Sequence, residues 1–273
     1  MSTLGLIAGH GEFPLLLAEQ AQKANISVVA FAIIGETESR IEDIVKTVHW
    51  LEIHEVERLI ELLHDHHITE AVMAGKIHKA HLIKNAPALM KQMPLKNIWT
   101  NVLDRRDDSL LLAVAERFED AGVKLIASTT FMESFLAPVG VMTKRVPTDR
   151  EQEDILFGFD MAKKSAALDI GQTIIVKNKA VMAVEAIEGT DAAIKRGALL
   201  GGDGVVVVKV SKPHQDMRFD VPVVGVETLE VMSQVKACVL AVEAGKTLIM
   251  NKKKFVNKAD QRNVCVLGVA SHD

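Results

Sequence analysis

Carboxylates, basic side chains and glycine turns are concentrated between residues 184 and 227 of this 273-residue chain. Four of the carboxylates only accept hydrogen bonds when ionised and suit a hard cation such as Mg²⁺. They are Glu188, Asp191, Asp216 and Asp220. Lys209, Lys212 and Arg218 carry positive charges that suit phosphate oxygens. A hydrophobic core requires none of these groups, so together they predict a site for a metal–phosphate ligand. The alternative is a solvated loop with ordinary surface charges.

A second candidate site lies near the amino terminus, where Gly9-His10-Gly11 separates an apolar strand at residues 4–8 from a helical pattern at 15–23. A strand, a glycine turn and a helix in this order direct backbone N–H groups toward a phosphate. The dinucleotide-binding fingerprint is incomplete, because Pro14 stands where a third glycine belongs. We therefore expect a tight turn whose glycines line a polar ligand.

Gly75 and Lys76 end the fourth predicted strand, and ligands of α/β proteins usually bind at that edge of the sheet. Lys76 is thus a candidate phosphate contact. His78 and His81 follow it, and we expect both at the surface. The histidine-rich run at residues 64–67 is attributed to the favourable end of a helix dipole rather than to a metal site.

Strands and helices alternate regularly over residues 1–130, which predicts a mostly parallel sheet covered on both faces, as in a Rossmann-like α/β domain. Beyond residue 150 hairpins and helices are mixed, which predicts an α+β domain. The segment between them contains Pro147 and has no apolar periodicity. We therefore expect one domain at residues 1–140, a linker at 141–150 and a second domain at 151–273.

Composition excludes several classes of protein. With 48% hydrophobic and 25% charged residues the chain has ample material for a core, and its net charge of −4 argues against nucleic-acid binding. Cys238 and Cys265 sit in apolar runs, as buried reduced thiols of a cytosolic protein do. We expect no signal peptide and no membrane span, so any lipid contact is peripheral or through a pocket.

Several motifs occur in order along the chain and belong together. The first half contains Leu4-Gly5-Leu6-Ile7-Ala8-Gly9-His10-Gly11-Glu12-Phe13-Pro14 and Asp107-Asp108-Ser109-Leu110-Leu111. The second half contains Asp169-Ile170-Gly171-Gln172, Ala183-Val184-Glu185-Ala186-Ile187-Glu188-Gly189-Thr190-Asp191 and Lys212-Pro213-His214-Gln215-Asp216-Met217-Arg218-Phe219-Asp220-Val221-Pro222. Through nearly its whole length, the sequence resembles the LpxI type of UDP-2,3-diacylglucosamine diphosphatase.

This resemblance implies a cytoplasmic enzyme of lipid A biosynthesis, peripheral to the inner membrane, that requires Mg²⁺ or accepts Mn²⁺. It implies that water cleaves the pyrophosphate of UDP-2,3-diacylglucosamine, a lipid-linked UDP-sugar, into UMP and 2,3-diacylglucosamine 1-phosphate. It also implies a homodimer, with the substrate between the two domains and the second domain catalytic. The essential acidic residue of the family falls on Asp220, which would hold the metal or the water, with Asp216 as a further metal ligand.

The candidate substrate contacts come from both halves of the chain. They are Gly9, Gly11, Gly75, Lys76, Gln172, Glu188, Gly189, Thr190, Asp191, Arg196, Lys209, Lys212, Gln215 and Arg218. The competing interpretation is a non-catalytic nucleotide- or lipid-binding module. An NAD-dependent oxidoreductase is a third interpretation that rests on Gly9-His10-Gly11 alone, and it lacks an acidic residue closing the second strand near Ile33.

Overall fold

The computed structural model describes residues 3–78, 81, 82, 84, 85, 88, 107–213, 215–218 and 221–271, with the backbone alone at 107–111. The chain divides into two compact units, and each is described here by itself. One comprises Met1–Met132 with Asp216–Asp220, and the other comprises Glu133–Gln215 with Val221–Asp273. The division thus falls at Met132, whereas the expected first domain extends to residue 140.

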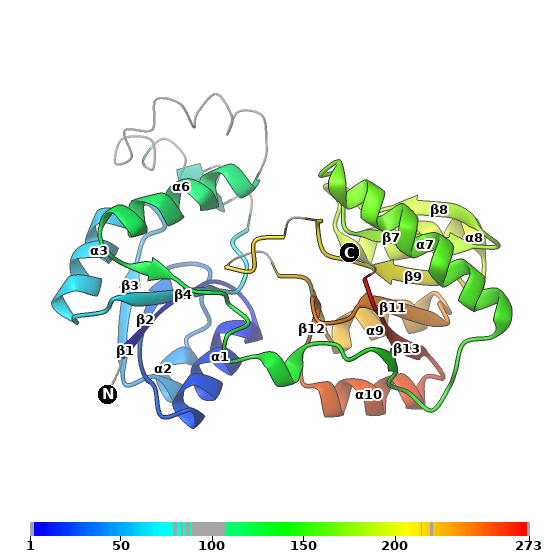
Figure 1. Ribbon diagram of the computed structural model, residues 1–273, viewed down its shortest axis with the longest axis horizontal. Helices are drawn as coiled ribbons and strands as arrows, with labels where there is room; N and C mark the ends of the chain where they lie inside the picture. The colour runs from blue at the N-terminus through cyan, green and yellow to red at the C-terminus, as the bar shows by residue number, and fades with distance from the viewer. Residues whose placement is uncertain are drawn as a thin grey trace. The chain divides into compact units, whose positions relative to one another are not determined.

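The first unit is built on a parallel sheet of five strands (Figure 1). The strands are β1 (Thr3–Ala8), β2 (Ser27–Ile33), β3 (Thr47–Leu51), β4 (Glu70–Ala74) and β5 (Lys124–Leu125). Their order is β3-β2-β1-β4-β5, and every neighbouring pair is parallel. The expected Rossmann-like fold class is confirmed. The strand order reverses direction between β1 and β4, where open α/β sheets form a crevice.

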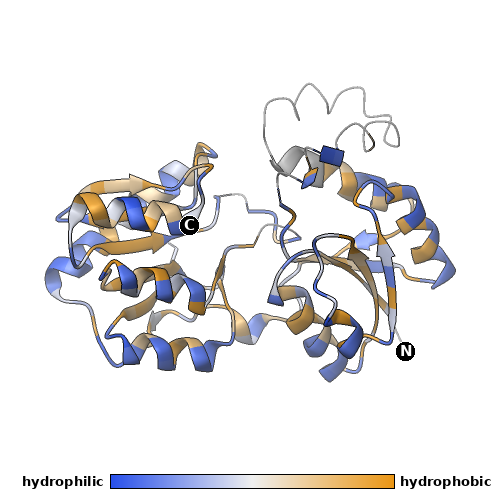
Figure 2. Cartoon of the chain, turned by 180° about the vertical axis from the view of Figure 1, so that it is seen from behind, coloured by the Kyte–Doolittle hydropathy of each residue, from blue (hydrophilic) through white to orange (hydrophobic). Residues whose placement is uncertain are grey.

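Helices cover both faces of this sheet. They are α1 (Glu12–Lys23), α2 (Ile41–Ile44), α3 (Val56–Asp65) and α6 (Asp107–Asp120). α3 and α6 pack on one face of the sheet, where Phe31, Leu63 and Phe118 are fully buried. α1 and α2 contact the same sheet on its other face. The strands are largely apolar in Figure 2, and the helices alternate apolar and polar surfaces, as packing on one side requires.

The second unit contains a mixed sheet of six strands. They are β6 (Gly140–Val141), β7 (Thr173–Lys177), β8 (Ala180–Val184), β9 (Val206–Lys209), β11 (Val239–Glu243) and β13 (Cys265–Val269). In the order β6-β13-β11-β9-β7-β8, the central β9, β11 and β13 are parallel, and the outer pairings are antiparallel. β10 (Val223–Val224) and β12 (Leu248–Ile249) form a separate parallel pair. Because β6 pairs with β13, part of the expected linker is strand.

Alternate residues of these strands face two different cores. One core packs α7 (Asp149–Ala167) against the side chains of Ile174, Val206 and Val208. The other packs α8 (Thr190–Gly201), α9 (Val226–Gln234) and α10 (Lys252–Gln261) against Ile175 and Val207. The period of two along each strand thus buries both faces.

The hairpin between β7 and β8, predicted from the sequence, is confirmed. Its two turn residues, Asn178 and Lys179, both have positive φ, 50° and 55°, as a type I′ turn requires. Lysine has no intrinsic preference for this conformation. The buried carboxylate of Asp154 compensates, because it accepts hydrogen bonds from the backbone N–H groups of Asn178 at 3.0 Å and Lys179 at 2.5 Å.

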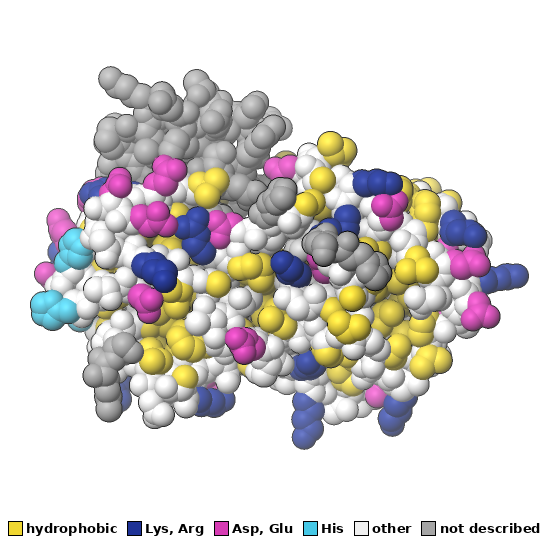
Figure 3. All heavy atoms as spheres, in the orientation of Figure 1, with side chains coloured by type: hydrophobic (Ala, Val, Ile, Leu, Met, Phe, Trp, Pro, Cys, Tyr) yellow, Lys and Arg dark blue, Asp and Glu magenta, His cyan; other side chains and the backbone are white. Residues whose placement is uncertain are grey.

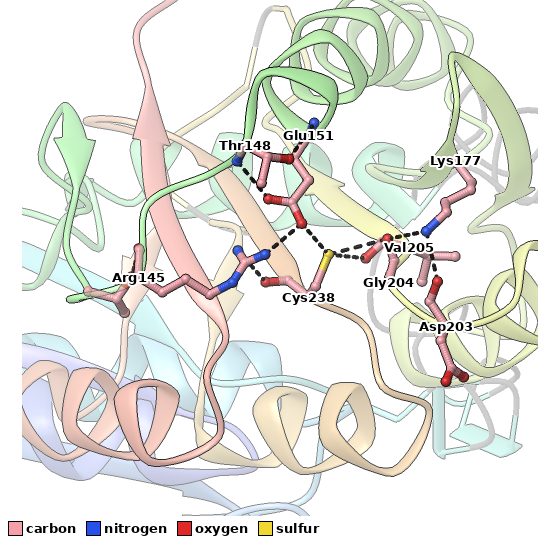
Figure 4. Close-up of polar contacts among 9 residues, drawn as sticks. Arg145, Thr148, Glu151, Lys177, Asp203, Gly204, Val205 and Cys238 are labelled. Atoms are coloured by element: carbon pink, nitrogen blue, oxygen red, sulfur yellow. Dashed lines mark hydrogen bonds and ion pairs between the residues drawn. The ribbon is translucent and has the colours of Figure 1, made fainter.

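A half-buried polar cluster in the same unit joins the segment after β6 to α7 and to Cys238, the residue before β11 (Figure 4). Glu151 accepts from Arg145 Nη2 at 2.6 Å and from Cys238 Sγ at 2.9 Å. Burial, with the neighbouring Glu151 charge, raises the pKa of Cys238 to about 12. Cys238 is therefore an unreactive, structural thiol, as its apolar surroundings in the sequence suggest.

Charged side chains of both signs are scattered over the face seen in Figure 3, without a single large basic field. In the part of the chain that the structure describes, no helix combines the length and the apolar character needed to cross a membrane.

Candidate functional site

The predicted polar residues of the second unit converge at one edge of its sheet. β9 ends at Lys209, which pairs with Thr173 at the start of the antiparallel β7. β8 ends nearby at Val184, beside Ile174. This is the carboxyl edge of the parallel strands, where ligands of α/β sheets usually bind.

Lys209 is oriented by the amino terminus of α8. Its Nζ donates to Thr190 Oγ1 at 3.0 Å, and Thr190 Oγ1 donates to Glu185 Oε1 at 2.7 Å. Thr190 is the first residue of α8, so the ammonium group lies beside helix N–H groups that have no partner within the helix. A cation and a helix amino terminus at one point favour a phosphate group.

Glu188 and Arg196 form an ion pair next to this point. Arg196 Nη2 donates to Glu188 Oε1 at 2.5 Å and to the carbonyl oxygen of Val184 at 2.8 Å. The Arg196 hydrogen bond lowers the pKa of Glu188. Glu188 is thus ionised and committed to Arg196, and Asp191 lies exposed in the first turn of α8.

The segment that follows β9 is fixed by a buried carboxylate that sequence reasoning missed. Glu243, at the end of β11, has no exposed surface. It accepts from the backbone N and the Oγ of Ser211, both at 2.8 Å, and from Lys163 Nζ at 3.0 Å. The available signal was an acidic residue closing an otherwise apolar strand.

Three further predicted contacts lie around the same edge. Lys212 Nζ pairs with Asp169 Oδ1 at 2.7 Å, and the backbone N of Lys212 donates to Gln215 Oε1 at 3.2 Å. The carbonyl oxygen of Gln172 accepts from the backbone N of Val210 at 2.9 Å. Gln172 thus lies beside the residue that follows Lys209, and Lys212 and Gln215 contact each other a few residues further along the chain.

Arg218 belongs to the first unit, although its motif follows the second unit's β9 in the sequence. Its guanidinium bonds both oxygens of Asp216, with Nη2 to Oδ2 at 2.8 Å, and its Nη1 bonds Glu119 Oε1 at 2.9 Å. The hydrogen bonds from Arg218 lower the pKa of Asp216. The carbonyl oxygen of Met217 accepts from the backbone N of Ser128 at 2.8 Å, which anchors the segment.

Asp216 therefore meets the requirements of a metal ligand only in part. Its oxygens are of the kind that Mg²⁺ prefers, but both already accept from Arg218. The other predicted metal ligand and catalytic group, Asp220, lies outside the described residues, as do His214 and Phe219 of the same motif.

In the first unit, two glycine turns interlock at the carboxyl ends of β1 and β4. The backbone N of His10 donates to the carbonyl oxygen of Lys76 at 2.7 Å, and the backbone N of Lys76 donates to that of His10 at 3.0 Å. A Cβ at Gly9 would lie 2.6 Å from the Lys76 carbonyl oxygen, and one at Gly75 would lie 2.8 Å from the His10 carbonyl oxygen. The predicted contacts Gly9, Gly11, Gly75 and Lys76 are thus brought together.

A cluster that the sequence did not predict adjoins these turns. Glu36, which follows β2 and is 3% exposed, accepts from His78 Nδ1 at 2.7 Å and from His81 Nδ1 at 2.8 Å. Burial alone would raise the pKa of Glu36, but the bonds from His78 and His81 outweigh it and lower that pKa. His81, expected at the surface, is only 19% exposed in its side chain, because it packs against this carboxylate. Both Glu36 oxygens accept hydrogen bonds from imidazoles. Glu36 therefore does not serve as the acidic residue that binds the ribose hydroxyl in NAD-dependent oxidoreductases.

The search of solved structures returned matches of low similarity. A UDP-glucose-4-epimerase from Stenotrophomonas maltophila is 19% identical over 45% of this chain and 35% of its own, with a TM-score of 0.28. The biotin carboxylase domain of a thermophilic 2-oxoglutarate carboxylase is 12% identical over 64% of this chain and 35% of its own, with a TM-score of 0.30. The chain spans about a third of the length of either, and such low scores carry no inference.

Sequence comparisons are more informative. The family model described as LpxI N-terminal domain matches residues 3–135, and the one described as LpxI C-terminal domain matches residues 138–267. The UDP-2,3-diacylglucosamine pyrophosphatase LpxI of Caulobacter vibrioides is 28% identical over 98% of both chains. Since the two family models account for nearly all of the sequence, the chain belongs to the LpxI family.

Proposed function

We propose that this protein hydrolyses the pyrophosphate bond of UDP-2,3-diacylglucosamine to UMP and 2,3-diacylglucosamine 1-phosphate in lipid A biosynthesis. The observation that carries the proposal is the match of both LpxI domains along the chain, together with a full-length relative named for this pyrophosphatase activity. In the reaction, one bridging P–O bond breaks. Water supplies the new oxygen on one phosphorus, and its protons pass to the product phosphates or to solvent.

The charges at the carboxyl edge of the second sheet support this chemistry. Hydrolysis of a phosphoanhydride requires neutralised phosphoryl oxygens and a positioned water. Lys209, held by Thr190 at the start of α8, is assigned to a phosphate oxygen. Lys76 and the glycines of the turn after β1, Gly9 and Gly11, are assigned to the substrate as well. The N–H groups of Gly9 and His10 already donate to the carbonyl oxygens of Ala74 and Lys76, so the contact at this turn is assigned to the backbone of Gly11.

Mg²⁺, with Mn²⁺ as a substitute, is the proposed cofactor, and it would neutralise charge on the pyrophosphate. Asp216 and Asp220 are its proposed ligands. Asp216 can join the cation only by giving up part of its contact with Arg218. Asp220 is also the proposed catalytic group, which orients the attacking water or accepts its proton.

The proposed assembly is a homodimer in the cytoplasm, in peripheral contact with the inner membrane, where a lipid-linked UDP-sugar is found. The family resemblance supports this proposal. Light scattering coupled to gel filtration checks the dimer, and flotation of the protein with phospholipid vesicles checks the peripheral contact.

The test of the function is a direct assay of the products. Purified protein is incubated with UDP-2,3-diacylglucosamine in mixed micelles, and UMP and the lipid phosphate are quantified by mass spectrometry. We expect stoichiometric amounts of both products with Mg²⁺, loss of both with EDTA, and recovery with Mn²⁺. If the protein binds the substrate but forms neither product, the proposed activity is wrong and the protein is a binding module.

The cation is tested separately from turnover. Electron paramagnetic resonance of Mn²⁺ titrated into the protein reports binding whether or not the substrate is hydrolysed. Wild-type protein should bind Mn²⁺ more tightly than the Asp220→Asn variant. Full activity after exhaustive chelation, or equal Mn²⁺ binding by both proteins, would remove the metal from the mechanism.

A further inference from the structure

Three segments that follow three neighbouring strands of the first sheet meet around one carboxylate. Glu36 follows β2, His10 follows β1 and His78 follows β4, and these strands are adjacent in the order β2-β1-β4. The segments are far apart in the sequence, but parallel strands bring their carboxyl ends to a single edge. The side chains offer imidazole nitrogen and carboxylate oxygen, the donors of borderline transition metals.

The donor atoms are already close to one another. One nitrogen from each of His10 and His78 and one oxygen of Glu36 lie within 4.8 Å of one another. The rings of His10 and His78 are 4.7 Å apart between centroids. Glu36 is buried while both imidazoles are exposed, so solvent ions can reach the nitrogens without unfolding the protein.

We propose that His10, Glu36 and His78 form a binding site for a divalent transition metal of the Zn²⁺ class in the first unit. Two histidines and one glutamate are a donor set found in protein zinc sites that keep a fourth position open. Mg²⁺, which prefers an all-oxygen set, is a poor match for two imidazoles. The site therefore differs in chemistry from the cation site of the proposed hydrolysis, and it does not depend on that function.

His10 is held as a ligating histidine is, because its Nδ1 lies 3.2 Å from the carbonyl oxygen of Glu36, a contact that orients the ring. His78 Nδ1 lies 2.7 Å from Glu36 Oε2, and a bound ion would take the place of the proton between these two atoms. His81, bonded to Glu36 Oε1 at 2.8 Å, holds the carboxylate in place from its other side.

Closing the site requires a small movement. Ligand atoms of a tetrahedral zinc ion are roughly 3.3–3.5 Å apart, since each lies about 2.0–2.2 Å from the metal. A 4.8 Å separation must therefore shrink by about 1.5 Å at most. The two exposed imidazoles can rotate through that distance, whereas Glu36 is fixed by burial and by the hydrogen bond from His81.

A bound ion would join the turns that follow β1, β2 and β4. The turns after β1 and β4 contain the residues assigned to the substrate, Gly9, Gly11, Gly75 and Lys76. The ion would therefore stiffen the carboxyl edge of the first sheet and stabilise the folded protein in proportion to its occupancy.

The test is metal binding to the full-length, untagged protein after removal of metals with a chelator. Isothermal titration with Zn²⁺ should give one equivalent bound, the visible spectrum of Co²⁺ should show nitrogen and oxygen coordination, and Zn²⁺ should raise Tm. His10→Ala and His78→Ala should each weaken Zn²⁺ binding at least tenfold. His81→Ala, which removes only a supporting hydrogen bond, should weaken it by about tenfold.

His64→Ala is the matched control, because His64 is an exposed histidine bonded to the carbonyl oxygen of Ala121, outside the cluster. It should leave Zn²⁺ affinity unchanged. Since the two main variants replace exposed side chains, both should remain folded, and circular dichroism checks this. Absence of stoichiometric Zn²⁺ binding, or equal affinity in His10→Ala, His78→Ala and the control, would overturn the proposal and leave Glu36 as a structural clamp.

Discussion

The carboxyl edges of the two sheets are organised around similar anchors but with different partners. Each has a buried carboxylate, Glu36 in the first unit and Glu243 in the second. Glu36 accepts from the imidazoles of His78 and His81, whereas Glu243 accepts from the ammonium of Lys163 and from Ser211. The second edge thus pairs its carboxylate with a lysine and a serine, and the first pairs its carboxylate with imidazoles, which are also ligands that transition metals prefer.

The difference shows that a buried acid can serve two purposes in one chain. Around Glu243 the carboxylate fixes the path of the backbone after β9, because Ser211 donates to it with both N and Oγ. Around Glu36 it orients side chains that remain accessible to solvent. Four substitutions, taken from the largest expected effect to the smallest, test this distinction.

The largest effect is expected at Asp220, the acidic residue of the family motif, which is neither of the two buried carboxylates. Asp220→Asn should lower kcat by on the order of 10²-fold or more, the scale expected on losing an acid–base group or an electrostatic stabiliser. Substrate binding should persist or tighten, because the substitution removes one negative charge from the proposed phosphate site. Steady-state kinetics and a thermal melt are the measurements, and a folded variant with wild-type kcat would exclude Asp220 from catalysis.

Glu243→Gln tests the ion pair between Glu243 and Lys163. It should destabilise the protein by about 2 kcal/mol, less than for a fully buried pair, because the Lys163 side chain keeps 17% of its exposure. Urea unfolding of the two proteins gives the difference. Asp160→Asn is the control, since it breaks only the exposed pair with Lys164 on α7. It should change the free energy of unfolding by at most about 0.5 kcal/mol. Equal effects of the two substitutions would contradict the anchoring role of Glu243.

Lys209→Met tests whether the second edge binds phosphate. Removing the cation at the start of α8 should lower kcat/KM roughly tenfold, mainly through KM, because a charge-assisted contact is lost in both the bound and transition states. Lys254→Met, on the exposed side of α10, is the control and should have wild-type kinetics. If both variants behave alike, the substrate assignment of Lys209 is wrong.

The smallest effect is expected for Glu36→Gln, about 1 kcal/mol at pH 7, because a glutamine keeps one acceptor oxygen for the imidazoles. The pKa of Glu36 is lowered in the folded protein, so its charge stabilises the fold above the unfolded value of 4.5. That contribution is lost as pH falls through the folded value. Urea midpoints of wild type and variant should therefore converge in acid, and a constant difference at every pH would refute this account.

Much of the fold follows from local pattern. The strands expected in the first 130 residues include β2, at Ser27–Ile33, where β-branched and apolar residues continue without a break. The hairpins expected beyond residue 150 include that of β7 and β8. The two-residue strand β6 ends inside the expected linker, at Val141, because a pairing that short has no periodicity to detect. α10 was also not predicted, since only Phe255 and Ala259 of its ten residues are buried.

The candidate sites were predictable where their residues are close in sequence. Thr190, Arg196 and Lys209 lie within one βαβ-like stretch, and the structure brings them together. Glu36 bonds His78 and His81, which are more than forty residues away in the sequence. No local sequence pattern therefore predicts that Glu36 is buried. Arg218 was expected to be directed at phosphate, but it pairs with Glu119, 99 residues earlier in the chain.

Two glycines of the first turn are required for unrelated reasons. At Gly9 the obstacle is volume, because the carbonyl oxygen of Lys76 stands 2.6 Å from where a Cβ would be placed. At Gly11 that space is open, but φ of 99° and ψ of −178° lie in a region that is essentially reserved for glycine among residues of natural handedness. An amino acid of opposite chirality has the backbone preference that Gly11 needs. The first position is therefore closed by packing density and the second by stereochemistry, although both would look equally invariant in a library of functional variants.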